Sequence, residues 1–98
     1  MTDSLKIKFD ELSLKINSET NQIQKQKFAQ EQIEILKQIQ QNFLIEAEKR
    51  GYALTSYNVL DIKLQQYKLM KQIAITNNLQ FEEYENLIQK TEKEIFGE

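Results

Sequence analysis

The side chains that could do chemistry in this chain are carboxylates, amines and phenols, because its 98 residues include no histidine and no cysteine. Such a chain has no Ser-His or Cys-His nucleophile pair and no conventional zinc site. Three acidic pairs stand at or near helical spacing: Glu31 with Glu34, Glu46 with Glu48, and Glu82 with Glu85. Paired carboxylates can hold a hard cation or act in acid–base catalysis. Because lysines are interspersed among them, we interpret these pairs as solvated helix faces, and we predict no catalytic residue, no metal site and no cofactor.

Positive charge is too sparse to indicate a nucleic-acid binder. The chain has 13 Lys and Arg against 15 Asp and Glu, a net charge of −2, and Arg50 is its single arginine. Affinity for phosphates requires clustered Lys and Arg. Lys63, Lys68 and Lys71 share one broad side of a predicted helix and could meet an acidic partner or an RNA backbone, but ordinary surface charge is the interpretation that we favour. We therefore expect no direct binding to nucleic acid.

The residues best suited to binding are aromatic or apolar and stand near predicted helix ends. Tyrosine offers a large contact area with a polar tip, and protein interfaces are enriched in it. The predicted candidate interface consists of Tyr52, Leu54, Tyr57, Phe81 and Tyr84. The alternative for each tyrosine is a half-buried place at one end of a helical bundle.

Helices must position these residues, since the chain has no proline and is rich in Gln, Glu, Lys, Leu and Ile. Residues 28–50 carry apolar side chains three, four or seven positions apart, which is one stripe of an α-helix. We expect a long helix over 19–50, a central helix over 56–76 and a C-terminal helix over 79–96. Gly51 is the expected left-handed residue after the long helix, and Asn77-Asn78 separates the last two helices.

The N-terminal segment fits two structures. Over residues 4–17 a period of two indicates a β-hairpin, whereas Leu5, Phe9, Leu12 and Ile16 form a helical stripe. A hairpin turn at Asp10-Glu11 lacks the glycine that two-residue loops favour, so we predict a short helix and keep the hairpin as the alternative. The polar segment 17–27, in which Asn17 and Ser18 could cap a helix, predicts a break. One uninterrupted helix over 4–50 remains the other possibility.

Short loops make neighbouring helices antiparallel. The sequence therefore predicts a single all-α domain over residues 1–98, an antiparallel helical hairpin, coiled coil or three- to four-helix bundle with one long helix. No apolar run approaches the ~20 residues that span a bilayer, and the N-terminus lacks the layout of a signal peptide. We expect a cytoplasmic protein, without membrane association, from a bacterium or a phage with an AT-rich genome.

From Ile39 onward the order of signals resembles the YlbF/YmcA family of small helical bacterial regulators. The residues that carry this resemblance are Gly51, Leu54-Thr55, the helix from Val59 to Ile75, Asn77-Asn78, and Phe81-Glu82-Glu83-Tyr84 leading to Leu87-Ile88. The resemblance covers little more than half of the chain. It implies a non-catalytic adaptor that joins other proteins in regulatory complexes, including complexes that act on RNA processing.

The apolar faces of the predicted helices exceed what one small core can bury. We therefore expect a protein partner or self-association into a homo-oligomer, and we predict a helical interaction module, an adaptor, regulator or inhibitor without catalysis. The alternative is a structural component of a phage or plasmid, such as a connector or scaffold subunit. A carboxylate–metal enzyme is the third hypothesis. The sequence leaves the partner, the pathway and the oligomer number open.

Overall fold

The computed structural model describes residues 2–97, with side chains from Ser4 onward. These residues form four α-helices and no strand: α1 (Thr2–Ser18), α2 (Gln22–Lys49), α3 (Tyr57–Thr76) and α4 (Glu82–Phe96). The predicted all-α class with one long helix is confirmed. Residues 4–17 are helical, so the β-hairpin alternative is wrong, and the break between α1 and α2 rules out a single helix over 4–50.

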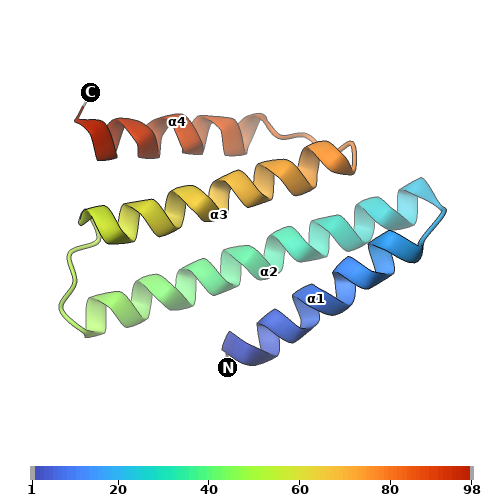
Figure 1. Cartoon of the computed structure of the whole chain (residues 1–98), viewed down its shortest axis with the longest axis horizontal. Helices are drawn as coiled ribbons and strands as arrows, with labels where there is room; N and C mark the ends of the chain where they lie inside the picture. The colour runs from blue at the N-terminus through green and yellow to red at the C-terminus, as the bar shows by residue number, and fades with distance from the viewer. Residues whose placement is uncertain (1, 98) are drawn as a thin grey trace.

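The four helices lie side by side in chain order and form one layer (Figure 1). Close backbone contacts join α1 to α2, α2 to α3, and α3 to α4, and within residues 2–97 they join no other helices. The molecule extends 44 × 31 × 13 Å between Cα atoms. The Cα atoms of a single helix lie on a cylinder about 4.6 Å across, so a shortest extent of 13 Å means that the layer is not flat. Because the backbones of α1 and α4 make no close contact within residues 2–97, the helices form an open layer and do not close around a central axis.

The two inner helices end in the same motif. After α2, Gly51 has φ +83° and the N–H of Tyr52 donates to the Ala47 carbonyl oxygen at 2.9 Å. After α3, Asn78 has φ +58°, and the N–H of Leu79 donates to the Ala74 carbonyl oxygen at 2.8 Å. Both are Schellman motifs, in which a residue in the left-handed conformation ends the helix and the following N–H groups bond to its last carbonyl oxygens. The left-handed conformation predicted at Gly51 is confirmed.

The long helix begins later than the sequence predicted. It starts at Gln22 instead of residue 19, because Asn21 is its N-cap: the Oδ1 of Asn21 accepts a hydrogen bond from the N–H of Gln24 at 3.0 Å. Asn17 and Ser18, the cap candidates from the sequence, are the last residues of α1. Residues 17–21 contain four residues of the types that cap helices, which made the choice ambiguous from local chemistry alone.

The last helix also begins later, at Glu82 instead of residue 79. Leu79 and Phe81 precede it in non-helical conformations, and both side chains pack against the buried core. These two apolar side chains anchor the connection between α3 and α4.

The core draws on the three helices from α2 to α4. Its buried cluster consists of Ile33 and Leu36 on α2, Met70 and Ala74 on α3, and Tyr84 on α4. Burying each large apolar side chain stabilises the fold by roughly 1.5–3 kcal/mol before conformational entropy is counted. Helix α1 adds Phe9 to the edge of this cluster, and it is also held by the buried Leu12 and by Gln32, whose side chain hydrogen-bonds to α1.

Candidate functional site

The five residues of the predicted interface lie in two separate places. Tyr52, Leu54 and Tyr57 lie together at the end of the layer where α2 leads into α3, and they are 59%, 40% and 65% exposed. Phe81 and Tyr84 lie where α3 leads into α4, and Tyr84 is only 5% exposed. Tyr84 is therefore more deeply buried than the half-buried place considered as the alternative for it, whereas Tyr52 and Tyr57 are open to solvent.

Tyr84 is held between α4 and α2. Its side chain belongs to the cluster of Ile33 and Leu36, and the Nζ of Lys37 lies 5.9 Å from the centroid of its ring. Burial raises the pKa of the Tyr84 phenol above its usual 10.0, against the opposing effect of the Lys37 ammonium. These contacts give Tyr84 a part in stabilising the core.

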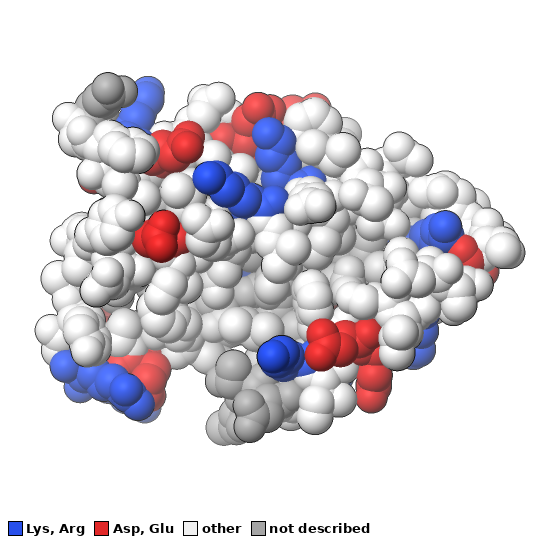
Figure 2. All heavy atoms as spheres, in the orientation of Figure 1, with Lys and Arg blue, Asp and Glu red and all other residues white. Residues whose placement is uncertain are grey.

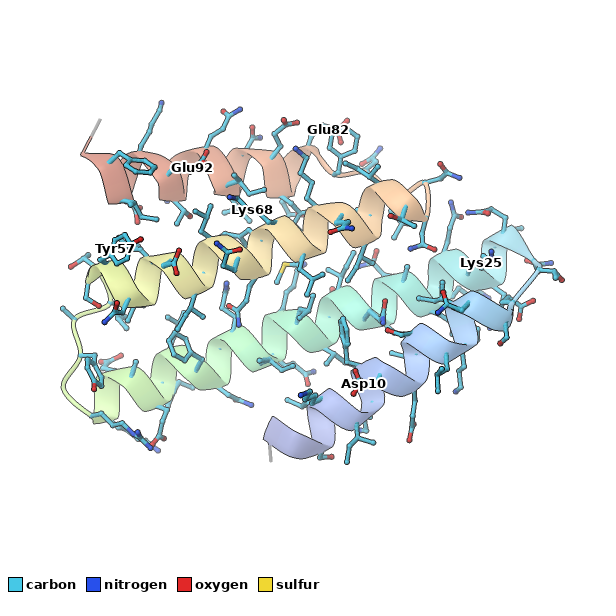
Figure 3. All side chains as sticks on the ribbon, in the orientation of Figure 1. Asp10, Lys25, Tyr57, Lys68, Glu82 and Glu92 are labelled. Atoms are coloured by element: carbon cyan, nitrogen blue, oxygen red, sulfur yellow. The ribbon has the colours of Figure 1, made fainter. Side chains whose placement is uncertain are left out.

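Large apolar side chains gather, exposed, at the end of the layer that holds Tyr52 and Tyr57. The last turn of α4 ends beside the first turn of α3, so the C-terminal side chain of α4 reaches the same end (Figures 1 and 3). We call this surface the apolar end, and define it by Ile45, Tyr52, Leu54, Tyr57, Ile62 and Phe96. The sequence did not single out Ile45, Ile62 or Phe96; Phe96 stands one position off the apolar stripe of its helix, and that offset was the available signal.

A hollow of about 370 Å³ lies between α2 and α3 at the apolar end. Its apolar lining comes from Phe43, Ala47, Val59 and Ile62, with Tyr52 beside them. At its edge the Nε of Arg50 lies 3.1 Å from an oxygen of Glu46. The hollow lies beside the last part of α2, which extends beyond the start of α1, since α1 has 17 residues against 28 in α2 (Figure 1).

Each predicted carboxylate pair has one member in an ion pair with a nearby cation. Glu34 lies 3.5 Å from Lys37, Glu46 lies 3.1 Å from Arg50, and Glu85 lies 3.4 Å from Lys71. Exposed pairs of this kind contribute ~0–1 kcal/mol each. Within the part of the chain that the structure describes, no group of three or more potential metal ligands is present.

The three lysines of α3 do not form a continuous basic surface with their neighbours. Lys71 is paired with Glu85 and lies 6.0 Å from the ring centroid of Phe81. Lys68 is exposed, and Lys63 is partly buried. Acidic and basic side chains are interspersed over the face drawn in Figure 2, with a broad uncharged area across its middle. In residues 2–97, none of the helices combines the length and apolar composition needed to cross a bilayer.

Comparison with known proteins adds no relative: no family model, curated protein or solved structure matches the chain. The similarity of the C-terminal half to the YlbF/YmcA family therefore stays a prediction. The apolar end, with its hollow and its exposed tyrosines, is the surface best suited to a function.

Proposed function

We propose that this protein is a non-catalytic helical interaction module that binds a protein surface through its apolar end. One observation carries the proposal: six large apolar side chains remain exposed at one end of the open layer of helices. Exposed large apolar side chains that gather in one region of a protein commonly mark a binding site, whereas singly scattered ones need no explanation.

The composition of the apolar end supports this proposal. Strong interfaces centre on Tyr, Trp and Arg side chains that fill or border desolvated pockets, within a polar rim. Here Tyr52 and Arg50 border an apolar hollow, and Tyr57 projects from the same end. A hollow of about 370 Å³ has room for a large apolar side chain from another molecule.

The residue types support binding over catalysis. Histidine and cysteine are absent from the sequence, and Glu34, Glu46 and Glu85 lie in ion pairs with lysine or arginine. The similarity of the C-terminal half to the YlbF/YmcA family points to the same kind of role, an adaptor or regulator that works by contact with other proteins.

The test is capture from the source cell with matched surface variants. The tagged wild-type chain should recover a partner in stoichiometric amount, or a second copy of itself, and the Tyr52→Ala/Tyr57→Ala double variant should lose it. Ile23→Ala removes an equally exposed side chain at the opposite end of α2 and should retain the partner. All three chains must show the same thermal transition. Absence of any stoichiometric partner, together with a monomeric chain at every concentration, would show the proposal to be wrong.

A further inference from the structure

A second hollow, of about 300 Å³, lies between α1 and α3, the two helices that flank α2 (Figure 1). The backbones of α1 and α3 make no close contact within residues 2–97, so side chains border the space between them. We call this hollow the amide groove, and define it by Phe9, Ser13, Gln32, Leu69, Ile73 and Asn77. It lies along the second half of α3, whereas the apolar end begins at the first turn of that helix. The amide groove is therefore separate from the surface proposed to bind a protein.

The side chain of Gln32 presents an unpaired oxygen in this groove. The residue is only 3% exposed, and its Nε2 donates twice to α1, to the Oγ of Ser13 at 2.7 Å and to the Phe9 carbonyl oxygen at 3.0 Å. None of the residues that the structure describes donates a hydrogen bond to the Oε1 of Gln32, and this oxygen is not sealed off from solvent. Because Gln32 lines the groove, the small surface that it retains opens there.

Asn77 repeats this arrangement from α3. It is 5% exposed, and its Nδ2 donates to the Ile73 carbonyl oxygen at 2.8 Å, which fixes the orientation of the amide. In the described part of the chain no group donates to its Oδ1, and Asn77 lines the same groove as Gln32. Buried amide oxygens are nearly always hydrogen-bonded, because leaving one unpaired is costly. Two such oxygens in one groove point to a ligand that brings its own N–H groups.

Charge restricts what this ligand can be. Of the described residues that line the groove, none is charged. A carboxylate, a phosphate or an ammonium group would therefore leave water without gaining a counter-charge, which is unfavourable. The side-chain amides of Asn17 and Gln72, which also line the groove, can donate to the carbonyl groups of a neutral ligand. The lining thus favours an uncharged ligand with both N–H and carbonyl groups.

The apolar part of the lining indicates the shape and size of the ligand. Phe9 on α1 faces the groove together with Leu69 and Ile73 on α3. Small-molecule sites combine an apolar lining with a few placed polar groups, and their volumes run from roughly 300 to 1,000 Å³. The amide groove stands at the lower end of this range. It therefore suits a single planar ring, which can stack on Phe9.

We propose that the amide groove binds a small, uncharged, planar ring compound that has N–H groups on two of its edges, as the free pyrimidine bases do. One N–H group donates to the Oε1 of Gln32 and the other to the Oδ1 of Asn77. The ring lies against Phe9, and its carbonyl groups accept hydrogen bonds from Asn17 and Gln72. A ligand of this size in an open groove binds weakly, in the millimolar range.

A titration with three related pyrimidines, followed by NMR of the whole ¹⁵N-labelled chain at neutral pH, tests the proposal. Uracil is neutral and has two N–H groups, 1,3-dimethyluracil keeps the ring and carbonyl groups without them, and orotate adds a carboxylate. Uracil should give saturable shifts at the side-chain amides of Gln32 and Asn77. Its dimethyl derivative should bind roughly ten-fold more weakly, because both hydrogen bonds are lost. Orotate should not bind.

Variants separate recognition by the amides from effects on folding. In Asn77→Ala the preference for uracil over 1,3-dimethyluracil should fall from about ten-fold to about three-fold, because one of the two acceptor oxygens is gone. This ratio compares two ligands on the same variant, so a general loosening of the groove does not change it. The matched control is Leu14→Ala, which removes a side chain that is 70% exposed on α1 and does not line the groove. It should keep the wild-type preference, and circular dichroism establishes that both variants are folded.

The proposal fails if uracil gives no saturable shift at Gln32 and Asn77, which would show that the groove holds solvent only. Equal binding of uracil and 1,3-dimethyluracil also overturns it, as does an unchanged preference in Asn77→Ala. The proposed protein interaction stands or falls separately, because the Tyr52→Ala/Tyr57→Ala double variant should bind uracil like the wild type.

Discussion

The side chains of Gln32 and Ser13 are joined by a hydrogen bond of 2.7 Å, donated by the Nε2 of Gln32 to the Oγ of Ser13. The same Nε2 also donates to the Phe9 carbonyl oxygen at 3.0 Å, and the Gln32 residue is 3% exposed. This buried amide fastens α1 to α2. Its contribution matters because, in residues 2–97, α2 is the only helix whose backbone comes close to that of α1.

Replacing Gln32 with leucine should therefore loosen α1 while leaving the rest of the layer folded. Two hydrogen bonds are lost for a side chain of similar size, at a cost of about 1–2 kcal/mol. Native-state hydrogen exchange should show faster exchange in α1, with α3 unchanged. The control is Gln38→Leu at an exposed position of the same helix. Equal protection of α1 in the wild type and in Gln32→Leu would contradict this assignment.

Two isoleucines of α2 should differ sharply when shortened. Ile33 is 1% exposed in the core cluster, whereas Ile45 is 51% exposed at the apolar end. Ile33→Ala should lower the free energy of unfolding by about 2–5 kcal/mol, because it removes buried methyl groups and leaves a cavity. Ile45→Ala should change it by less than about 0.5 kcal/mol. Urea titration of both variants measures the difference. Similar losses of unfolding free energy in the two variants would show that Ile33 is not part of the core.

Substitution of Gly51, in the left-handed turn after α2, should lower stability through backbone strain and not through a clash with a neighbouring residue. Gly51 has φ +83°, and a Cβ added there would meet no atom within 4 Å. Gly51→Ala should nevertheless destabilise the protein by about 1–2 kcal/mol, because L-residues with a Cβ avoid this conformation. Gly51→Asn should cost less, since asparagine tolerates it. Thermal unfolding that ranks alanine above asparagine in stability would argue against a left-handed turn at this position.

Alkaline pH should weaken the fold through Tyr84. Burial raises the pKa of this phenol above 10.0 in the folded protein, so folding favours its neutral form. The corresponding stability is complete below the pKa of the unfolded tyrosine and is lost as pH rises above it. Between neutral pH and a pH above 10.0, Tyr84→Phe should lose less stability than the wild type. Urea titrations at the two pH values measure this difference, and Tyr57→Phe at the exposed end serves as the control. A Tyr84→Phe variant that loses as much as the wild type would refute the prediction.

The features that the sequence predicted correctly depend on a few neighbouring residues. The apolar stripe of residues 28–50 predicted most of α2, and Gly51 predicted the left-handed turn, because both follow from local geometry. The separation of Tyr52 from Tyr84 could not be predicted in this way. Both are tyrosines near helix ends, and only the helices that cover Tyr84 distinguish them. Likewise, four residues of cap-forming type lie at positions 17–21 before α2, and Asn21 is the cap in the folded chain.

The order of helices in the layer also bears on how the protein is made. Because each close backbone contact joins helices that are consecutive along the chain, α1 and α2 can pair before α4 has left the ribosome. Contacts that are local in sequence also favour rapid folding. The cluster around Tyr84 combines α2, α3 and α4, so the nascent chain acquires its full stability only when α4 emerges.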